Sequence, residues 1–204
     1  MLTLFSLPLR SDEGNKNNVI FITLDGVRWQ DIVGSPDPFL DFTDRNPTWP
    51  FIQQHIIPNG VFIGNREVGS FMNVSNIYKV SLPGYFNILS GKQTSCWNND
   101  CGRITVPTFM EHISSKLKLK KDEVATFASW KEILDAIEHK KGSILSDGPQ
   151  FVDERADDIT LNLASKFLRK NNPRLLYIAL NDPDRFGHLG QYDHYIKALR
   201  KFDS

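Results

Sequence analysis

The fold is decided by residues 174–188, which read RLLYIALNDPDRFGH. The apolar run 175–180, bounded by polar residues and a proline, is typical of a buried strand in a parallel sheet. In open α/β folds, ligands bind beyond the carboxyl ends of such strands. Asp184 and His188 therefore lie where a site is expected, and they offer an oxygen and a nitrogen to a divalent metal.

The rest of the chain alternates apolar runs with amphipathic segments. A second apolar run predicts a buried strand over residues 19–24, and shorter runs predict strands at 61–63 and 123–128. Helical spacing and early prolines predict helices that begin near Pro50 and that cover residues 83–89, 106–117, 130–137, 152–167 and 191–204. We therefore expect an α/β fold, with a mainly parallel sheet flanked by helices on both faces.

The composition is that of an ordinary globular domain. Of 204 residues, 40% are hydrophobic and 24% are charged, and 24 basic residues balance 24 acidic ones. A formal net charge of zero gives no reason to expect a nucleic-acid duplex as a partner, and no stretch has the length of a membrane span. We expect residues 1–17 to be a tail or a processed leader and residues 18–204 to form one domain. The sequence does not reveal the oligomeric state.

The two cysteines leave the cellular compartment open. Cys96 and Cys101 are separated by four residues, a spacing that suits either a small disulfide loop or two free thiols. The localisation is therefore unknown, with a periplasmic or secreted location slightly favoured.

Two further segments carry candidate chemistry. Asp25-Gly26 follows strand 19–24, where a carboxylate is a hard ligand for a divalent cation, although Asp-Gly is also a common turn dipeptide. Ser81-Leu82-Pro83 opens a predicted helix. The serine hydroxyl becomes a nucleophile if a metal or a base lowers its pKa, and otherwise it is a plain N-cap.

Three polar residues near the 174–188 segment have weaker claims. Asp182 competes with Asp184 as a ligand, but Asp-Pro-Asp is also good turn chemistry. Asp193 and His194 are expected on the surface of the last helix or in support of the ligands.

The order of these motifs resembles the alkaline phosphatase-like metalloenzyme superfamily, and most closely its type I phosphodiesterase/nucleotide pyrophosphatase branch. The resemblance covers residues 18–204. It implies that Asp25 is a metal ligand and that Ser81 is the metal-bound nucleophile. It further implies that Asp184 and His188, within Asp-Arg-Phe-Gly-His, hold the other metal.

The resemblance also implies a reaction. Two divalent ions, zinc or alternatively manganese, would activate Ser81 and stabilise the leaving group in the hydrolysis of a small-molecule phosphate ester. Residues 90–99 resemble the family segment whose asparagine contacts a phosphoryl oxygen, and Asn99 or Asn98 is the match. The alternatives are a sulfatase or a phosphotransferase of the same superfamily, or an inactive α/β binding module. Tyr85 stands where sulfatases carry an arginine, which argues against a sulfatase.

The chain departs from the family in its last part. The later Asp-His-Gly segment and the distal histidine of the family have no counterpart in these 204 residues. We therefore expect a fold that is incomplete at the C-terminus, in which each metal keeps only part of its ligand set. The activity of this chain alone is open.

Overall fold

The computed structural model describes residues 2–3, 17–40 and 43–204, so most of the predicted tail lies outside the described residues. The chain divides into two compact units. The helical unit contains Thr23–Asn73 and Asn181–Ser204, and the sheet unit contains residues 17–22 and Val74–Leu180. Since both units are built from non-contiguous segments, the single domain expected over residues 18–204 stays a prediction.

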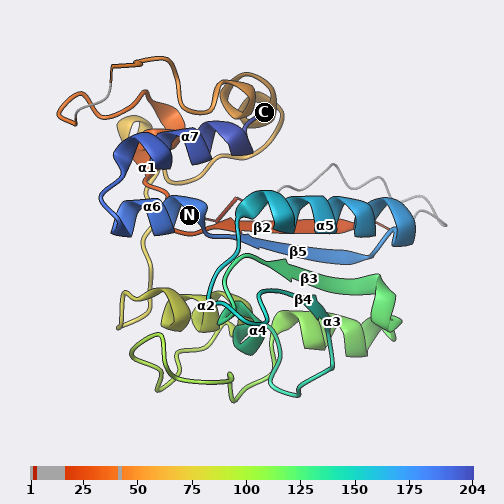
Figure 1. Cartoon of the computed structure of the whole chain (residues 1–204). Coiled ribbons are helices and arrows are strands. Elements are labelled where there is room, and N and C mark those ends of the chain that lie inside the picture. The colour runs from red at the N-terminus through yellow and green to blue at the C-terminus, as the bar shows by residue number, and fades with distance from the viewer. Residues whose placement is uncertain (1, 4–16, 41–42) are drawn as a thin grey trace. The chain divides into compact units, whose positions relative to one another are not determined.

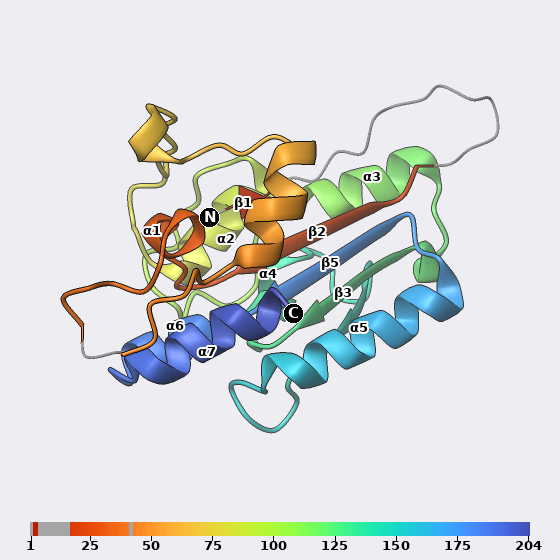
Figure 2. The same ribbon diagram turned by 90° about the horizontal axis from the view of Figure 1, so that it is seen from above.

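One sheet with four parallel strands organises the fold (Figure 1). The strands are β1 (Leu2–Thr3), β2 (Val19–Leu24), β3 (Val124–Ala128), β4 (Leu145–Asp147) and β5 (Leu175–Leu180). Their order is β1-β2-β5-β3-β4, and Figure 2 shows β2, β5 and β3 side by side. β3 runs parallel to both β4 and β5, with Val124 opposite Leu175. The bounds predicted for β2 and β5 are confirmed. β5 is buried along its whole length as expected, but the burial predicted for β2 is wrong at its start, where Val19 and Ile20 are exposed.

Helices cover both faces of this sheet within the sheet unit. Successive side chains of a strand point to opposite faces, and β3 shows where they go. The ring of Phe127 packs at 5.4 Å from that of Phe167 on α5 (Asp157–Asn171), whereas the Thr126 hydroxyl lies 3.6 Å from the sulfur of Met110 on α3 (Phe109–Leu117). The predicted α/β class with helices on both faces is therefore confirmed (Figure 1).

The remaining helices of the sheet unit are short. They are α2 (Ser81–Ser90), the 3-10 turn η4 (Lys121–Glu123) and α4 (Ile133–Ala136). The helix predicted over residues 83–89 is confirmed as α2. The helix predicted from residue 106 begins at Phe109 instead, because Thr108 is the N-cap and forms a capping box with Glu111.

The helical unit consists of small elements, and its core includes residues of α7. These elements are α1 (Trp29–Val33), the π-helix η1 (Ile52–Ile56), the 3-10 turns η2 (Ile57–Asn59) and η3 (Arg66–Val68), α6 (Asp182–His188) and α7 (Tyr192–Phe202). Ile32, Trp49 and Ile196 belong to its core. The helix expected to begin near Pro50 is confirmed, because Pro50 is itself helical. The last helix, expected over residues 191–204, is confirmed as α7, which ends at Phe202.

Three further predictions about elements are wrong in part or in full. Residues 61–63 are irregular rather than a strand. Val61 is 72% exposed, so the apolar side chain that suggested a strand is not buried against a sheet. The helix predicted from residue 152 begins only at Asp157, because Glu154 pairs with Trp130 in an antiparallel bridge. The same pairing confines the helix predicted over residues 130–137 to α4. Strand β4 was missed because three residues show no period.

Candidate active site

Asp25 and Gly26 form the turn that ends β2. Gly26 has φ +70°, and a Cβ atom placed on it would lie 2.5 Å from the Cα of Asp184, so only glycine fits. This contact brings the Asp25–Gly26 turn against the first residues of α6. The two candidate ligand segments, far apart in the sequence, therefore meet within the helical unit.

The carboxylate of Asp25 is only half satisfied. Oδ1 accepts the Gly26 N–H at 2.9 Å, while Oδ2 is buried and has no hydrogen-bond partner among the described residues. A buried acceptor without a partner costs about 1–3 kcal/mol, and buried carboxylates normally pair with a cation or coordinate a metal. This orphaned oxygen fits the ligand role expected of Asp25.

Asp184 and His188 form a pair across one turn of α6. The Asp184 Oδ2 and His188 Nε2 atoms are 3.4 Å apart, and the imidazole is 81% exposed. Residues four apart share a helix face, which is why the sequence spacing predicted this pair. An accessible imidazole beside a carboxylate suits zinc, and an oxygen-rich site would also accept manganese.

The neighbouring candidates are engaged elsewhere. Asp182 accepts a hydrogen bond from Arg185 at 2.9 Å, in agreement with turn and cap chemistry. Asp193 and His194 lie on α7 within 3.1 Å of each other, and both are about half exposed, as expected for surface residues. Among the residues that the structure describes, no group of three or more histidine, cysteine, aspartate or glutamate side chains is arranged to hold a metal ion. The donors present fit part of a coordination shell.

Ser81 is the first residue of α2 and belongs to the sheet unit. The N-cap is Val80, which makes no side-chain cap, so the alternative that Ser81 is itself the N-cap is wrong. Ser81 is partly exposed, and its hydroxyl makes no hydrogen bond to any described residue. The hydroxyl thus lies at the positive end of the helix dipole and is accessible to a ligand.

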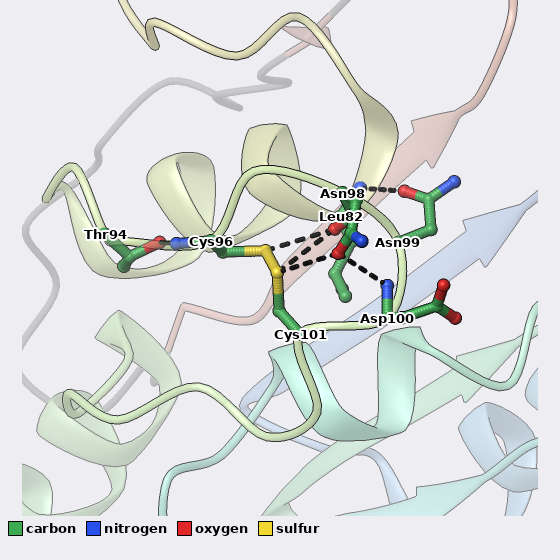
Figure 3. Close-up of a disulfide and its surroundings, with 7 residues drawn as sticks. All are labelled: Leu82, Thr94, Cys96, Asn98, Asn99, Asp100 and Cys101. Carbon is green, nitrogen blue, oxygen red and sulfur yellow. Dashed lines mark hydrogen bonds between the residues drawn. A yellow bond between two sulfur atoms is a disulfide. The ribbon is translucent and has the colours of Figure 1, made fainter.

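Asn99 reaches the same helix end from a loop 17 residues further on. Its Oδ1 accepts the backbone N–H of Leu82 at 3.0 Å, and thereby supplies the cap that Val80 cannot give (Figure 3). Asn98 instead uses its Oδ1 to accept the N–H of Asp100. Of the two asparagines left open by the sequence, Asn99 is therefore the one that binds α2, at the residue that follows Ser81.

A disulfide holds the loop that carries Asn99. Cys96 and Cys101 are bonded, with Cα atoms 5.5 Å apart (Figure 3). The carbonyl oxygen of Asn98 lies 3.2 Å from both sulfur atoms; these are sulfur–oxygen contacts, because a disulfide has no hydrogen to donate. The short ring closes the loop around Asn98 and Asn99 and limits where the Asn99 amide can go.

A partly buried polar network lies in the helical unit, close in sequence to Asp25 at its Arg28 end. Arg28 binds Asp31 at 2.8 Å, and Asp31 also accepts the Tyr195 hydroxyl at 2.7 Å. The hydrogen bond to Asp31 raises the pKa of Arg28, and burial raises that of Tyr195, so the arginine stays charged and the phenol neutral. Sequence reasoning missed these residues, because Tyr195 reads only as one apolar position of a helix.

Comparison with known proteins adds no assignment: no family model, no characterised protein and no solved structure matches this chain. The described part of the chain also contains no helix with the length and apolarity needed to cross a membrane. Membership of the family that the motifs resemble therefore stays a prediction, and the function is inferred from the residues themselves.

Proposed function

We propose that this protein is a metal-dependent hydrolase of phosphate esters, of the phosphodiesterase or nucleotide pyrophosphatase kind, with Ser81 as its nucleophile. The observation that carries this proposal is the contact between Gly26 and Asp184, which gathers the orphaned Asp25 carboxylate and the Asp184–His188 pair in one unit. Oxygen and nitrogen donors of these kinds favour divalent cations.

The chain's own groups support distinct roles in this reaction. The Ser81 hydroxyl gives its proton to solvent and its oxygen attacks phosphorus. An oxygen–phosphorus bond forms while the bond to the leaving oxygen breaks, and that oxygen takes up a proton from solvent to leave as the alcohol. Water then hydrolyses the phosphoseryl group and regenerates Ser81. Its position at the start of α2 places developing negative charge at the positive end of a helix dipole.

Asn99 suits the role of a donor to a phosphoryl oxygen. Because its Oδ1 is occupied by the Leu82 N–H, its amide NH₂ group remains to donate outward. A preorganised donor of this kind stabilises charge that develops in the transition state.

Asp25 would be a ligand of one metal, and Asp184 and His188 would be ligands of the other. Bound divalent ions, zinc first and manganese second, would supply Lewis-acid activation of the phosphate ester. The chain's contribution is to keep two carboxylates and one imidazole in place, and the glycine contact at Gly26 does so for Asp25.

The test is turnover of phosphate mono- and diesters by the whole chain with added zinc or manganese. Ser81→Ala should reduce kcat at least 1000-fold and leave the thermal unfolding midpoint unchanged, since loss of a nucleophile removes the covalent route (about 10³-fold or more). Ser115→Ala, on the exposed face of α3, is the matched control and should be fully active. Hydrolysis that survives Ser81→Ala would rule out this nucleophile. Turnover of sulfate esters alone would favour the sulfatase alternative.

A further inference from the structure

A hollow of about 310 Å³ lies within the helical unit and is partly open to solvent. Three aromatic side chains line it, those of Phe186, Tyr192 and Tyr195. The rings of Tyr192 and Tyr195 are stacked, with centroids 5.7 Å apart and planes 18° apart. A cavity of about 150 Å³ is enough to bind benzene. This hollow therefore has room for one substituted aromatic ring between aromatic walls.

The hollow adjoins the candidate metal ligands. Gly26 and Gly187 are also part of its lining. Gly26 follows Asp25 in the chain and contacts Asp184, and Gly187 precedes His188. A ligand in the hollow would therefore lie against chain neighbours of residues that would hold the metals.

The charges around the hollow favour a neutral ligand. Arg28 forms part of the wall, with its guanidinium 5.7 Å from the centroid of the Tyr192 ring. Two carboxylates already bind it, Asp31 at 2.8 Å and Asp37 at 3.3 Å. One positive charge against two negative ones leaves no attraction for an anion, whereas a neutral ring gains from burial and ring stacking.

We infer that this hollow binds the leaving group of the substrate, and that this group is a neutral aromatic alcohol. The inference rests on the proposed phosphoesterase function and specifies its substrate class. Tyr192 and Phe186 are then specificity-determining residues, since they supply ring surface from α7 and α6. The phenol of Tyr192 is already engaged, because its oxygen accepts the Asp37 N–H at 2.7 Å. Its contribution to the ligand therefore comes from the ring.

The first experiment measures binding without turnover. The whole ¹⁵N-labelled chain is titrated with 4-methylphenol, a neutral ring, and with 4-hydroxybenzoate, the same ring carrying a carboxylate. A fragment of this size is expected to bind with a Kd on the order of 1 mM. We expect saturable shifts of the Gly187, Gly190 and Tyr192 amides with 4-methylphenol, and binding at least about tenfold weaker for the anion.

Two variants of Tyr192 distinguish the contribution of its ring to binding from that of its hydroxyl. Tyr192→Ala should weaken 4-methylphenol binding about tenfold, whereas Tyr192→Phe, which keeps the ring, should bind as the wild type does. Phe186→Leu, which keeps apolar volume and removes a ring, provides a second test if Tyr192→Ala does not fold. Phe151→Ala, at a fully exposed aromatic residue of the sheet unit, is the control. Equal binding by the wild type, Tyr192→Ala and Phe186→Leu, or shifts at other amides only, would overturn the inference.

Kinetics then distinguish this inference from the proposed function. For a phosphate diester whose leaving group is 4-methylphenol, Tyr192→Ala should lower kcat/KM about tenfold. For the matching diester whose leaving group is methanol, kcat/KM should stay unchanged. An equal loss for both esters would overturn the leaving-group pocket while the phosphoesterase proposal stands. Binding of 4-methylphenol without hydrolysis of any ester would refute the phosphoesterase function, and with it the assignment of the hollow to a leaving group.

Discussion

Gly26 is the residue on which the candidate metal site depends most directly. Its positive φ is one demand for glycine, and the 2.5 Å that would separate an added Cβ from the Asp184 Cα is another. Gly69 has a similar φ of +74° but nothing within 4 Å of its added Cβ, so Gly69→Ala isolates the cost of the backbone conformation. We expect Gly69→Ala to lose about 1 kcal/mol of unfolding free energy.

Gly26→Ala should lose about 3 kcal/mol, because the turn must also move away from α6. Zinc affinity should fall about tenfold or more, since residues that position ligands have effects of that size. Urea unfolding and zinc titration of both variants measure these effects. Equal losses in the two alanine variants would contradict a clash at Gly26.

The sequence could identify the candidate residues but not their contacts. Asp25, Asp184 and His188 follow strands or share a helix face, and local spacing reveals such relations. The buried, unpartnered Oδ2 of Asp25 results from packing between segments about 160 residues apart, which no local pattern reports.

At the scale of elements, the 96–101 loop and α2 act together. Replacing both cysteines by serine removes a short covalent ring, at a cost of about 2 kcal/mol in unfolding free energy. It should also free Asn99 from Leu82, so that the Leu82 amide exchanges faster with deuterium and kcat falls about tenfold while KM changes little. Hydrogen exchange and steady-state kinetics test this together. Unchanged protection of the Leu82 amide would show that the disulfide does not position Asn99.

The start of α3 makes a pH-dependent prediction. Burial tends to raise the pKa of Glu111, but backbone N–H groups of Thr108, His139 and Lys140 donate to its carboxylate and hold the pKa below its ordinary value of 4.5. The charged form therefore stabilises the folded state above about pH 4.5, and this contribution is lost as the pH falls through the lowered pKa.

Glu111→Gln should cost about 1–2 kcal/mol at pH 7, and the difference from the wild type should disappear in acid. Unfolding by urea at several pH values measures this. A difference that stays constant down to acid pH would mean that charge plays no part in the capping of α3.

Elements could be predicted where one hydrophobic pattern extends over the whole element. β2 and β5 are continuous apolar runs, so their predicted bounds agree with the structure. The start of α5 could not be predicted, because the bridge between Trp130 and Glu154 holds an otherwise helical pattern extended. Pairing with a distant segment overrides local spacing there.

For the whole molecule, alternation of strands and helices was enough to predict the α/β class. The division into two units could not be predicted, because the chain passes between them at residues 22–23, 73–74 and 180–181 without a linker-like composition. The proposed metal ligands belong to the helical unit, and Ser81 and Asn99 belong to the sheet unit. The phosphoesterase proposal requires that residues of both units serve one reaction.

The most direct test of that requirement is to trap the covalent intermediate on Ser81. The whole chain with zinc is mixed with a phosphate ester, quenched in acid within one turnover, digested, and examined by mass spectrometry. The proposal predicts a phosphoryl adduct on the peptide that contains Ser81, and its absence when zinc is removed by a chelator or when Ser81 is replaced by alanine. Hydrolysis without any adduct, or with an adduct on another residue, would contradict the proposed function.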